Sequence, residues 1–226
     1  MSETKEVFGL FGAGGFARET MVALKDQLRR TRGPLNAEAD YRICFVDTEP
    51  ELSEVNQLPC LNEDDFFNLP GRKFFNIAIN ESRLREKISV KAEPLATPFS
   101  IIANSVEIGD GNQLHPSAIM AAKTMLTSNT TIGRYFQANL YSYVAHDSII
   151  GDFVTFAPRV CCNGNIIIED HAYIGTAAVL RQGTANKPLR IGAGAIVGMG
   201  AVVTKDVPAG TTVIGNPARP MEPRKR

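Results

Sequence analysis

A six-residue repeat of apolar residues runs through the chain from Ile102 to Leu180. Every sixth position is apolar, apart from the small residues Ala138 and Cys162, and the repeat pauses after Leu180 before it resumes at Ile191. Neither a helix of period 3.6 nor a strand of period 2 keeps this register. A repeat of this length predicts a parallel β-helix, in which three hexads make one triangular coil. Residues eighteen apart would then stack about 4.8 Å apart.

Composition narrows the classes of function. The 226 residues carry 24 basic and 24 acidic side chains, and a net charge of zero disfavours a nucleic-acid-binding protein. We interpret the basic stretch Arg224–Arg226 as a solvated tail. No apolar run approaches the roughly 20 residues that span a bilayer. The charged start, Met1–Glu6, does not resemble a signal peptide. We therefore expect a cytoplasmic protein that neither binds nucleic acid nor enters the membrane.

Cysteines and histidines give no sign of a metal site. The four cysteines lack CxxC spacing and are expected to be buried thiols, with Cys162 on an inward repeat position. Cys161 and Cys162 have no histidine nearby in the sequence and are poor candidates for a nucleophile. Of the three histidines, His115 and His171 are expected to be structural.

The first hundred residues follow a different pattern. Val7–Phe11 predicts a strand, Gly12–Gly15 a tight turn, Arg18–Arg30 a helix and Tyr41–Val46 a second strand. This is a βαβ unit, half of a Rossmann-like fold.

A further strand over Phe74–Ile79 and a helix over Glu81–Lys91 precede the prolines that lead into the repeats. We expect an α/β domain over residues 1–98 and a β-helix domain over residues 99–226.

The glycine turn is a candidate phosphate-binding cradle. Gly12, Gly14 and Gly15 let the backbone approach a phosphate closely at a helix N-terminus, and Asp47 is placed to accept hydrogen bonds from a ribose or base. Phe16 and Thr48 adjoin these positions. The alternative is that the glycines serve only a tight turn. A nicotinamide dehydrogenase needs two such halves, so a mononucleotide or a nucleotide-linked sugar fits better.

His146 is the candidate catalytic residue. It occupies an outward repeat position and is followed by Asp147, which can fix the imidazole tautomer and raise its basicity. Its stacked neighbours, eighteen residues away, are Ser128 and Gly164, and the glycine leaves room for a substrate. The alternative is a surface histidine.

The interruption between Leu180 and Ile191 has a composition suited to a loop. It is either a cover for a ligand on the solenoid wall or a harmless insertion. Lys187, Arg190 and Lys205 are candidate contacts for the phosphates of a long anionic cofactor.

The hexads, the stretch Asn139–Asp147 and the ending Val213–Arg219 resemble the left-handed β-helix acyltransferases. With the glycine-turn domain, the chain is similar to nucleotide-sugar N-acetyltransferases that act on 4-amino-4,6-dideoxy sugars. The run Tyr141–Asp147 with Cys162–Gly164 is similar to the perosamine-type members, which serve O-antigen and lipopolysaccharide synthesis. The resemblance covers almost the whole chain.

The resemblance implies a homotrimer with acetyl-CoA in a groove between solenoids and a nucleotide-linked amino sugar on the N-terminal domain. It implies that His146 is the general base, Asp147 its acidic partner, and Asn139 part of the sugar pocket. Gly164 matches a glycine whose amide meets the acetyl group. The sugar amine would attack the thioester directly, with no covalent acyl-enzyme.

The remaining cofactor positions follow from the same resemblance. Thr176 and Met199 fall near the pantetheine groove. Two positions depart from the related bacillosamine enzymes, which have a histidine where this chain has Phe16 and another where it has Thr155. Thr155 is therefore a weaker candidate for cofactor binding.

Three interpretations remain open at this stage. The first is N-acetylation of a GDP-, dTDP- or UDP-linked amino sugar. The second is O-acetylation of a sugar of the sialic acid type, and the third is a non-catalytic solenoid that holds partners. Replacing His146 by Ala separates the third from the other two.

Overall fold

The computed structural model describes residues 6–36 and 40–221 and contains two compact units. The first takes the chain up to Asn104 together with Pro116–Ile119, and the second takes Ser105–His115 and the chain from Met120 onward. The predicted basic tail Arg224–Arg226 lies outside the described residues. A division at residue 98 stays a prediction about the boundary between folding domains.

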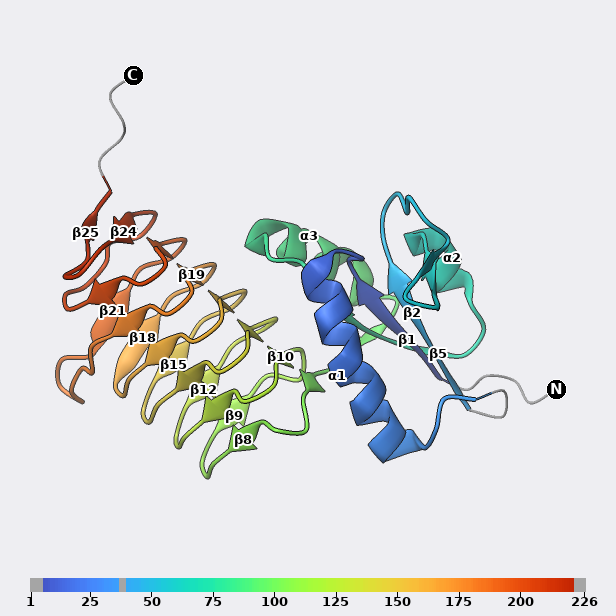
Figure 1. The fold of residues 1–226 in the computed structure, drawn as a ribbon, viewed down its shortest axis with the longest axis horizontal. Coiled ribbons are helices and arrows are strands. Elements are labelled where there is room, and N and C mark those ends of the chain that lie inside the picture. The colour runs from blue at the N-terminus through green and yellow to red at the C-terminus, as the bar shows by residue number, and fades with distance from the viewer. Residues whose placement is uncertain (1–5, 37–39, 222–226) are drawn as a thin grey trace, which may run out of the picture. The chain divides into compact units, whose positions relative to one another are not determined.

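The first unit is an α/β domain built on one six-stranded sheet (Figure 1). The sheet has the order β3-β4-β2-β1-β5-β6, and all neighbours are parallel except β3 and β4. Its strands are β1 (Glu6–Phe11), β2 (Tyr41–Val46), β3 (Glu54–Val55), β4 (Leu58–Leu61), β5 (Arg72–Ile77) and β6 (Thr97–Pro98). The helices are α1 (Gly15–Arg32), α2 (Glu63–Asn68) and α3 (Ser82–Ala92).

Alternation along β1 places apolar side chains on both faces of this sheet. Phe8 and Leu10 belong to the core that α1 covers with Met21 and Leu24. On the opposite face, the ring of Phe66 from α2 lies so close to Gly9 that a Cβ there would stand 2.6 Å from it. The sheet is therefore covered on both faces, as a parallel sheet requires.

The predicted βαβ unit is confirmed, and the prediction is less accurate beyond it. The predicted strand Phe74–Ile79 starts earlier and ends at Ile77. The last sheet hydrogen bond at this end joins the Ala78 N–H to the Phe11 carbonyl, so Ile79 has already left the sheet. The short elements β3, β4 and α2 were not predicted, because each is too short to show a period.

The second unit is a parallel β-helix, whose flat coils stack from green to red in Figure 1. Three ladders of short strands form its faces. Before the interruption after Leu180, paired strands lie eighteen residues apart, as Tyr143 and Cys161 do. One ladder contains β8 (Glu107–Ile108), β11 (Met125–Leu126), β14 (Tyr143–Val144), β17 (Cys161–Cys162), β20 (Val179–Leu180) and β23 (Val202–Val203). The second contains β9 (Gln113–Leu114), β12 (Thr131–Ile132), β15 (Ile149–Ile150), β18 (Ile166–Ile168) and β21 (Leu189–Ile191). The third includes β13 (Gln137–Ala138), β16 (Thr155–Phe156), β19 (Tyr173–Ile174), β22 (Ile196–Val197), β24 (Thr212–Ile214) and β25 (Arg219–Pro220), and β10 (Ile119–Met120) and β7 (Ile101–Ile102) precede them in the chain.

The repeat positions form the interior of the coils. From residue 120 onward they are all buried: Met120, Leu126, Ile132, Ala138, Val144, Ile150, Phe156, Cys162, Ile168, Ile174, Leu180, Ile191, Val197 and Val203. The residues four places later are also buried, except Thr184 in the interruption, so most hexads send two side chains inward. The first hexads are an exception, because Ile108 is 45% exposed.

The coils turn through residues with left-handed backbone conformation. Ten non-glycine corner residues, spaced six apart, have positive φ: Lys123, Asn129, Tyr135, Tyr141, Asp147, Phe153, Arg159, Asn165, His171 and Ala177. Left-handed conformation costs a non-glycine residue about 1–2 kcal/mol. The rings of Tyr135, Phe153 and His171 stack along one such corner, with centroids 5.4 and 5.2 Å apart. This stack gives His171 the structural setting that the sequence predicted.

The interruption after Leu180 is a tight hairpin rather than a long loop. Thr184 and Lys187 exchange two backbone hydrogen bonds of 3.0 Å. Five extra residues are absorbed here, and Ile167 then pairs with Arg190, twenty-three positions on.

Three of the four thiols are buried, as predicted, whereas Cys161 is partly exposed. Burial raises the pKa of Cys44 to about 12 and that of Cys162 well above its usual range. These thiols are therefore protonated at neutral pH.

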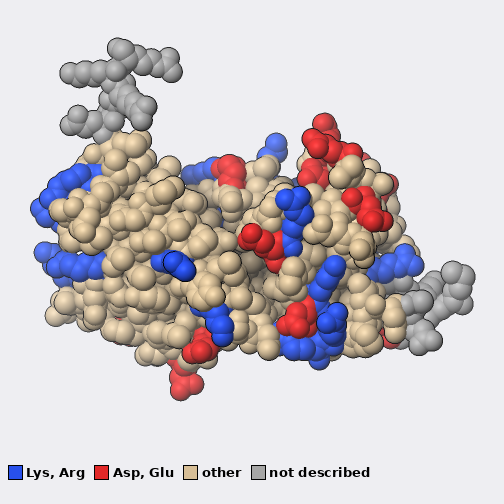
Figure 2. All heavy atoms as spheres, viewed as in Figure 1, with Lys and Arg blue, Asp and Glu red and all other residues tan. Residues whose placement is uncertain are grey.

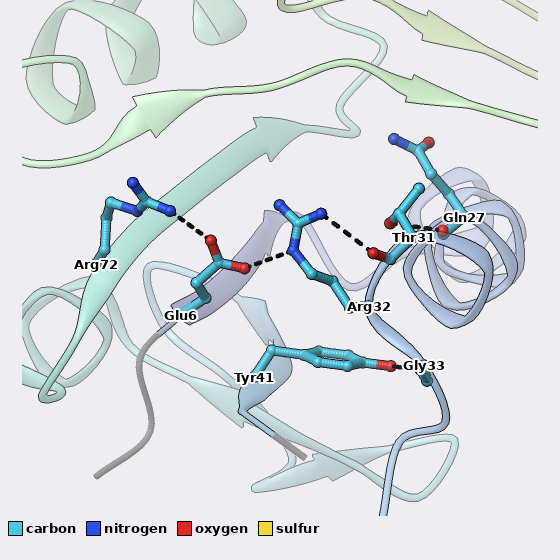
Figure 3. Close-up of polar contacts among 7 residues, drawn as sticks. All are labelled: Glu6, Gln27, Thr31, Arg32, Gly33, Tyr41 and Arg72. Carbon is cyan, nitrogen blue, oxygen red and sulfur yellow. Dashed lines mark hydrogen bonds and ion pairs between the residues drawn. The ribbon is translucent and has the colours of Figure 1, made fainter.

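Glu6 ties three elements together at the amino end of the sheet (Figure 3). Its carboxylate accepts from Arg32, at the end of α1, at 2.8 Å and from Arg72, on β5, at 2.5 Å. The hydrogen bond from Arg32 is the largest cause that lowers the pKa of Glu6 below its ordinary value of 4.5.

We expect Glu6→Gln to lower the free energy of unfolding by about 0.5–1 kcal/mol at pH 7. Because the folded pKa of Glu6 is lowered, its stabilisation is present above pH 4.5 and is lost as the pH falls through the folded pKa. Urea unfolding from pH 7 to pH 3 should show the two proteins converging in acid. Glu86→Gln, which removes a carboxylate from the exposed pair with Arg83, is the control. A constant difference across the series would contradict this assignment.

Candidate functional site

The predicted glycine turn joins β1 to α1. Gly12 has φ +100, and a Cβ there would stand 3.0 Å from the Ala78 carbonyl oxygen, so only glycine fits. Gly14 and Gly15 at the start of α1 have open space where a side chain would be. The first turn of the helix contains no acidic side chain. Its positive end therefore faces an accessible space, which suits an anion.

A cavity of about 390 Å³ lies over this turn. It brings together all the nucleotide-site residues predicted on the first unit: Gly12, Gly14, Gly15, Phe16, Asp47 and Thr48. A second wall comes from the connection between β5 and α3, through Ala78, Ile79 and Asn80, and from Leu84 and Ile88 of α3. The sequence did not predict this second wall.

A second cavity, of about 500 Å³, adjoins the first and shares Ala13, Gly14 and Asp47 with it. Arg18 of α1 and the acidic residues Glu49, Glu51 and Glu54 also line it. Asp47 stands directly after β2, where its carboxylate accepts from the Glu49 N–H at 3.4 Å. Asp47 therefore lines both cavities, as expected of an acidic residue at the end of the second strand.

The solenoid carries the predicted His146–Asp147 pair. His146 Nδ1 lies 2.8 Å from Asp147 Oδ2, and the two side chains are 43% and 52% exposed. A carboxylate can only accept, so Nδ1 donates to Asp147, and in the neutral imidazole Nε2 then carries the lone pair. The imidazole is therefore held in the tautomer that accepts a proton at Nε2.

The imidazole of His146 lies directly over Gly164. A Cβ at position 164 would stand 2.5 Å from both Cε1 and Nε2. The expectation that Gly164 leaves room for a substrate needs correction, because the histidine ring itself occupies that space. The glycine instead makes room for the imidazole ring.

A network of hydrogen bonds surrounds Gly164 in the same coils. The Tyr143 hydroxyl donates to Asn163 Oδ1 at 2.7 Å, and Asn163 Nδ2 donates to the Leu180 carbonyl at 2.7 Å. Burial, with the neighbouring Cys161, raises the pKa of Tyr143 to about 12, so the hydroxyl keeps its proton. The carbonyl of His146 accepts from the Asn165 N–H at 2.9 Å. The backbone on both sides of Gly164 is therefore held in place.

The other predicted solenoid residues fall into two groups. Asn139 and Thr155 are buried in the single chain, and Asn139 donates to the Phe156 carbonyl at 2.9 Å. Thr176, Lys187, Met199 and Lys205 are exposed, with Met199 at 81%. Their roles in binding stay predictions.

The surface shows no continuous basic stripe in the view of Figure 2, where basic groups stand apart among acidic and uncharged ones. Within residues 6–36 and 40–221, no cluster of three or more potential metal ligands is present. None of the helices in these same ranges has the length and apolar character needed to cross a bilayer.

The chain is similar to known proteins in both sequence and structure. No family model matches the chain. A GDP-perosamine N-acetyltransferase of Escherichia coli O157:H7 is 46% identical over 224 residues, which cover 96% of each chain. The solved structure of WeeI from Acinetobacter baumannii AYE is 46% identical with a TM-score of 0.90, covering 96% of this chain and 100% of that one.

A third similar structure is the acetyltransferase domain of PglB from Neisseria gonorrhoeae FA1090, in complex with acetyl coenzyme A. It is 25% identical with a TM-score of 0.81, and covers 96% of this chain and 100% of that one. The α/β unit followed by a left-handed β-helix is thus an acetyltransferase architecture. From its identity and coverage, this chain belongs to the GDP-perosamine N-acetyltransferase family of hexapeptide-repeat acyltransferases.

Proposed function

We propose that this protein transfers the acetyl group of acetyl-CoA to the 4-amino group of GDP-perosamine. The observation that carries this proposal is the His146–Asp147 pair over Gly164, in a chain 46% identical to a GDP-perosamine N-acetyltransferase. Acetyl-CoA is the donor that the PglB domain binds.

The nucleotide is assigned to the cavity over the glycine turn. Gly14 and Gly15 at the N-terminus of α1 suit the diphosphate, because the helix end offers backbone N–H groups and a partial positive charge. Asp47 and Thr48 at the end of β2 suit the ribose or base. The acidic residues of the adjoining cavity suit a base with several N–H donors, such as guanine.

The chemistry is assigned to Nε2 of His146. The amine nitrogen attacks the thioester carbonyl, a C–N bond forms, and Nε2 accepts the proton that the nitrogen loses. When the C–S bond breaks, the CoA sulfur takes the electron pair and the proton returns to it from the imidazolium. Asp147 stabilises the imidazolium through the 2.8 Å hydrogen bond at Nδ1. The backbone N–H of Gly164 is our candidate for stabilising the oxyanion.

We further propose a homotrimer in a reducing compartment, which fits the cytoplasm. Tyr173 and Ile196, neighbours on β19 and β22, point outward and are 38% and 43% exposed in the single chain. Contact with neighbouring solenoids would cover them. The described thiols are all free, which suits a reducing compartment.

We expect the purified protein to release CoA thiol from acetyl-CoA in the presence of GDP-perosamine. His146→Ala should lower kcat about 10²–10⁴-fold, because the general base is lost. His115→Ala, which lies outside the proposed site, should retain activity. The assay should include dTDP- and UDP-linked 4-amino-4,6-dideoxyglucose and sialic acid as alternative acceptors.

If only sialic acid is acetylated, the protein is a sugar O-acetyltransferase and the proposed N-acetylation is wrong. Full activity of His146→Ala would contradict the role of the histidine. If no acceptor leads to release of CoA thiol, the assignment of acetyltransferase activity is contradicted.

We expect Gly164→Ala to lower kcat about ten-fold or more by displacing the imidazole, since a misplacement of 1 Å can cost about 10²-fold. Its stability should change little, because the contact is with the end of one partly exposed side chain. The sharper test is the double variant with His146→Ala. If Gly164 acts through the ring, the second substitution costs almost nothing further. Additive losses would show that Gly164 acts independently of His146.

We expect light scattering coupled to size-exclusion chromatography to give the mass of three 24.6 kDa chains. Ile196→Lys, which places a charge on the outward face of β22, should shift the population toward single chains. A wild-type protein that elutes as a monomer would contradict the trimer.

A further inference from the structure

Arg85 is an arginine in the interior of the first unit. It lies on α3, its side chain has no exposed surface, and it is among the largest fully buried side chains of the protein. Arginine is rarely fully buried, because removing its charge from water is costly unless hydrogen bonds compensate. Burial lowers the pKa of Arg85 from 12.5 to about 9, so the guanidinium is still charged at neutral pH. A group retained at this cost needs a specific reason.

The guanidinium donates to the backbone of the connection between β5 and α3. Its Nη1 donates to the Ile79 carbonyl at 2.8 Å and to the Asn80 carbonyl at 2.9 Å. The chain has left the sheet at this point, because β5 ends at Ile77. The two hydrogen bonds of Arg85 therefore connect α3 to the backbone of this segment.

The same two residues line the cavity together with the glycine turn. The wall touches the turn, since a Cβ at Gly12 would stand 3.0 Å from both the Ala78 carbonyl oxygen and Ile79 Cγ1. On either side of Arg85, Leu84 and Ile88 of α3 line the cavity. A shift of Ile79 or Asn80 therefore changes the width of the cavity directly.

We propose that Arg85 is a positioning residue for nucleotide binding, which holds the Ile79–Asn80 wall at the correct distance from the glycine turn. This inference rests on the proposed function of the cavity. It assigns Arg85 no contact with the nucleotide. A lysine would keep the charge but would lack the planar guanidinium that fixes the two N–H groups of Nη1 toward the two carbonyls. A methionine would fill similar space and leave both carbonyls without this donor.

The matched control is Arg83, on the same helix. Its side chain is 67% exposed, it pairs with Glu86, and it does not line the cavity. Arg83→Met removes the same chemical group from the same helix without changing the wall.

The test is calorimetric titration of GDP into the wild type, Arg85→Lys, Arg85→Met and Arg83→Met. We expect the Kd for GDP to rise about ten-fold or more for both Arg85 variants and to stay within about two-fold for Arg83→Met. In steady-state assays, the KM for GDP-perosamine should rise while kcat and the KM for acetyl-CoA stay near wild type. A general loss of structure would not produce this split. If Arg85→Met does not fold, the lysine variant decides the question.

A folded Arg85 variant that binds GDP as tightly as the wild type would overturn the positioning role and leave the proposed function intact. A fall in kcat together with comparable rises in the KM for both substrates would likewise overturn it, because that pattern indicates structural damage. A wild type that does not bind GDP would overturn both the nucleotide assignment and the role of Arg85.

Discussion

Stacking of each coil on the next is the interaction on which the second unit depends. The coil closes only because its corners adopt left-handed conformation, at a cost of about 1–2 kcal/mol for each non-glycine residue. Hydrogen bonds between coils offset this cost, including those from corner side chains. Asp170 Oδ1 accepts from the Asp152 N–H at 2.8 Å, and Asp152 Oδ1 accepts from the Arg134 N–H at 2.7 Å. Each coil therefore holds the corners of its neighbour, and no coil is stable by itself.

The proposed catalytic pair is built on one of these corners. Adjacent residues in a strand point to opposite faces, so His146 and Asp147 would diverge in a regular strand. Asp147 instead has φ +57, and this turn of the backbone brings its carboxylate back to His146 Nδ1. Aspartate is one of the few residues that tolerates left-handed conformation. The corner that the fold requires at this position is thus also the feature that orients the imidazole.

The sequence predicted the interior of the solenoid because burial repeats with the period of the coil. It did not predict the left-handed corners, since the usual signal, glycine, is replaced by residues such as Tyr135 and Phe153. The positions of the glycines relative to the repeat positions are also informative. Gly133 and Gly151 follow a repeat position by one residue and are needed where coils approach closely, whereas Gly164 follows by two and makes room for the His146 ring. That difference in register distinguishes the glycine of the proposed site from the glycines between coils.

The first unit shows a different limit of sequence analysis. The cradle was predictable because Gly12–Gly15 and Asp47 lie next to strand ends, where local sequence determines geometry. The second wall of the cavity was not predictable. The sequence of the helix over Glu81–Lys91 is typical of a charged amphipathic segment, and nothing in it distinguishes Arg85 from Arg83 and Lys87. Only the packing of α3 on the sheet buries one of them. A cavity formed by backbone groups binds only as well as those groups are placed, so the residues that determine its affinity include buried donors that never touch the ligand.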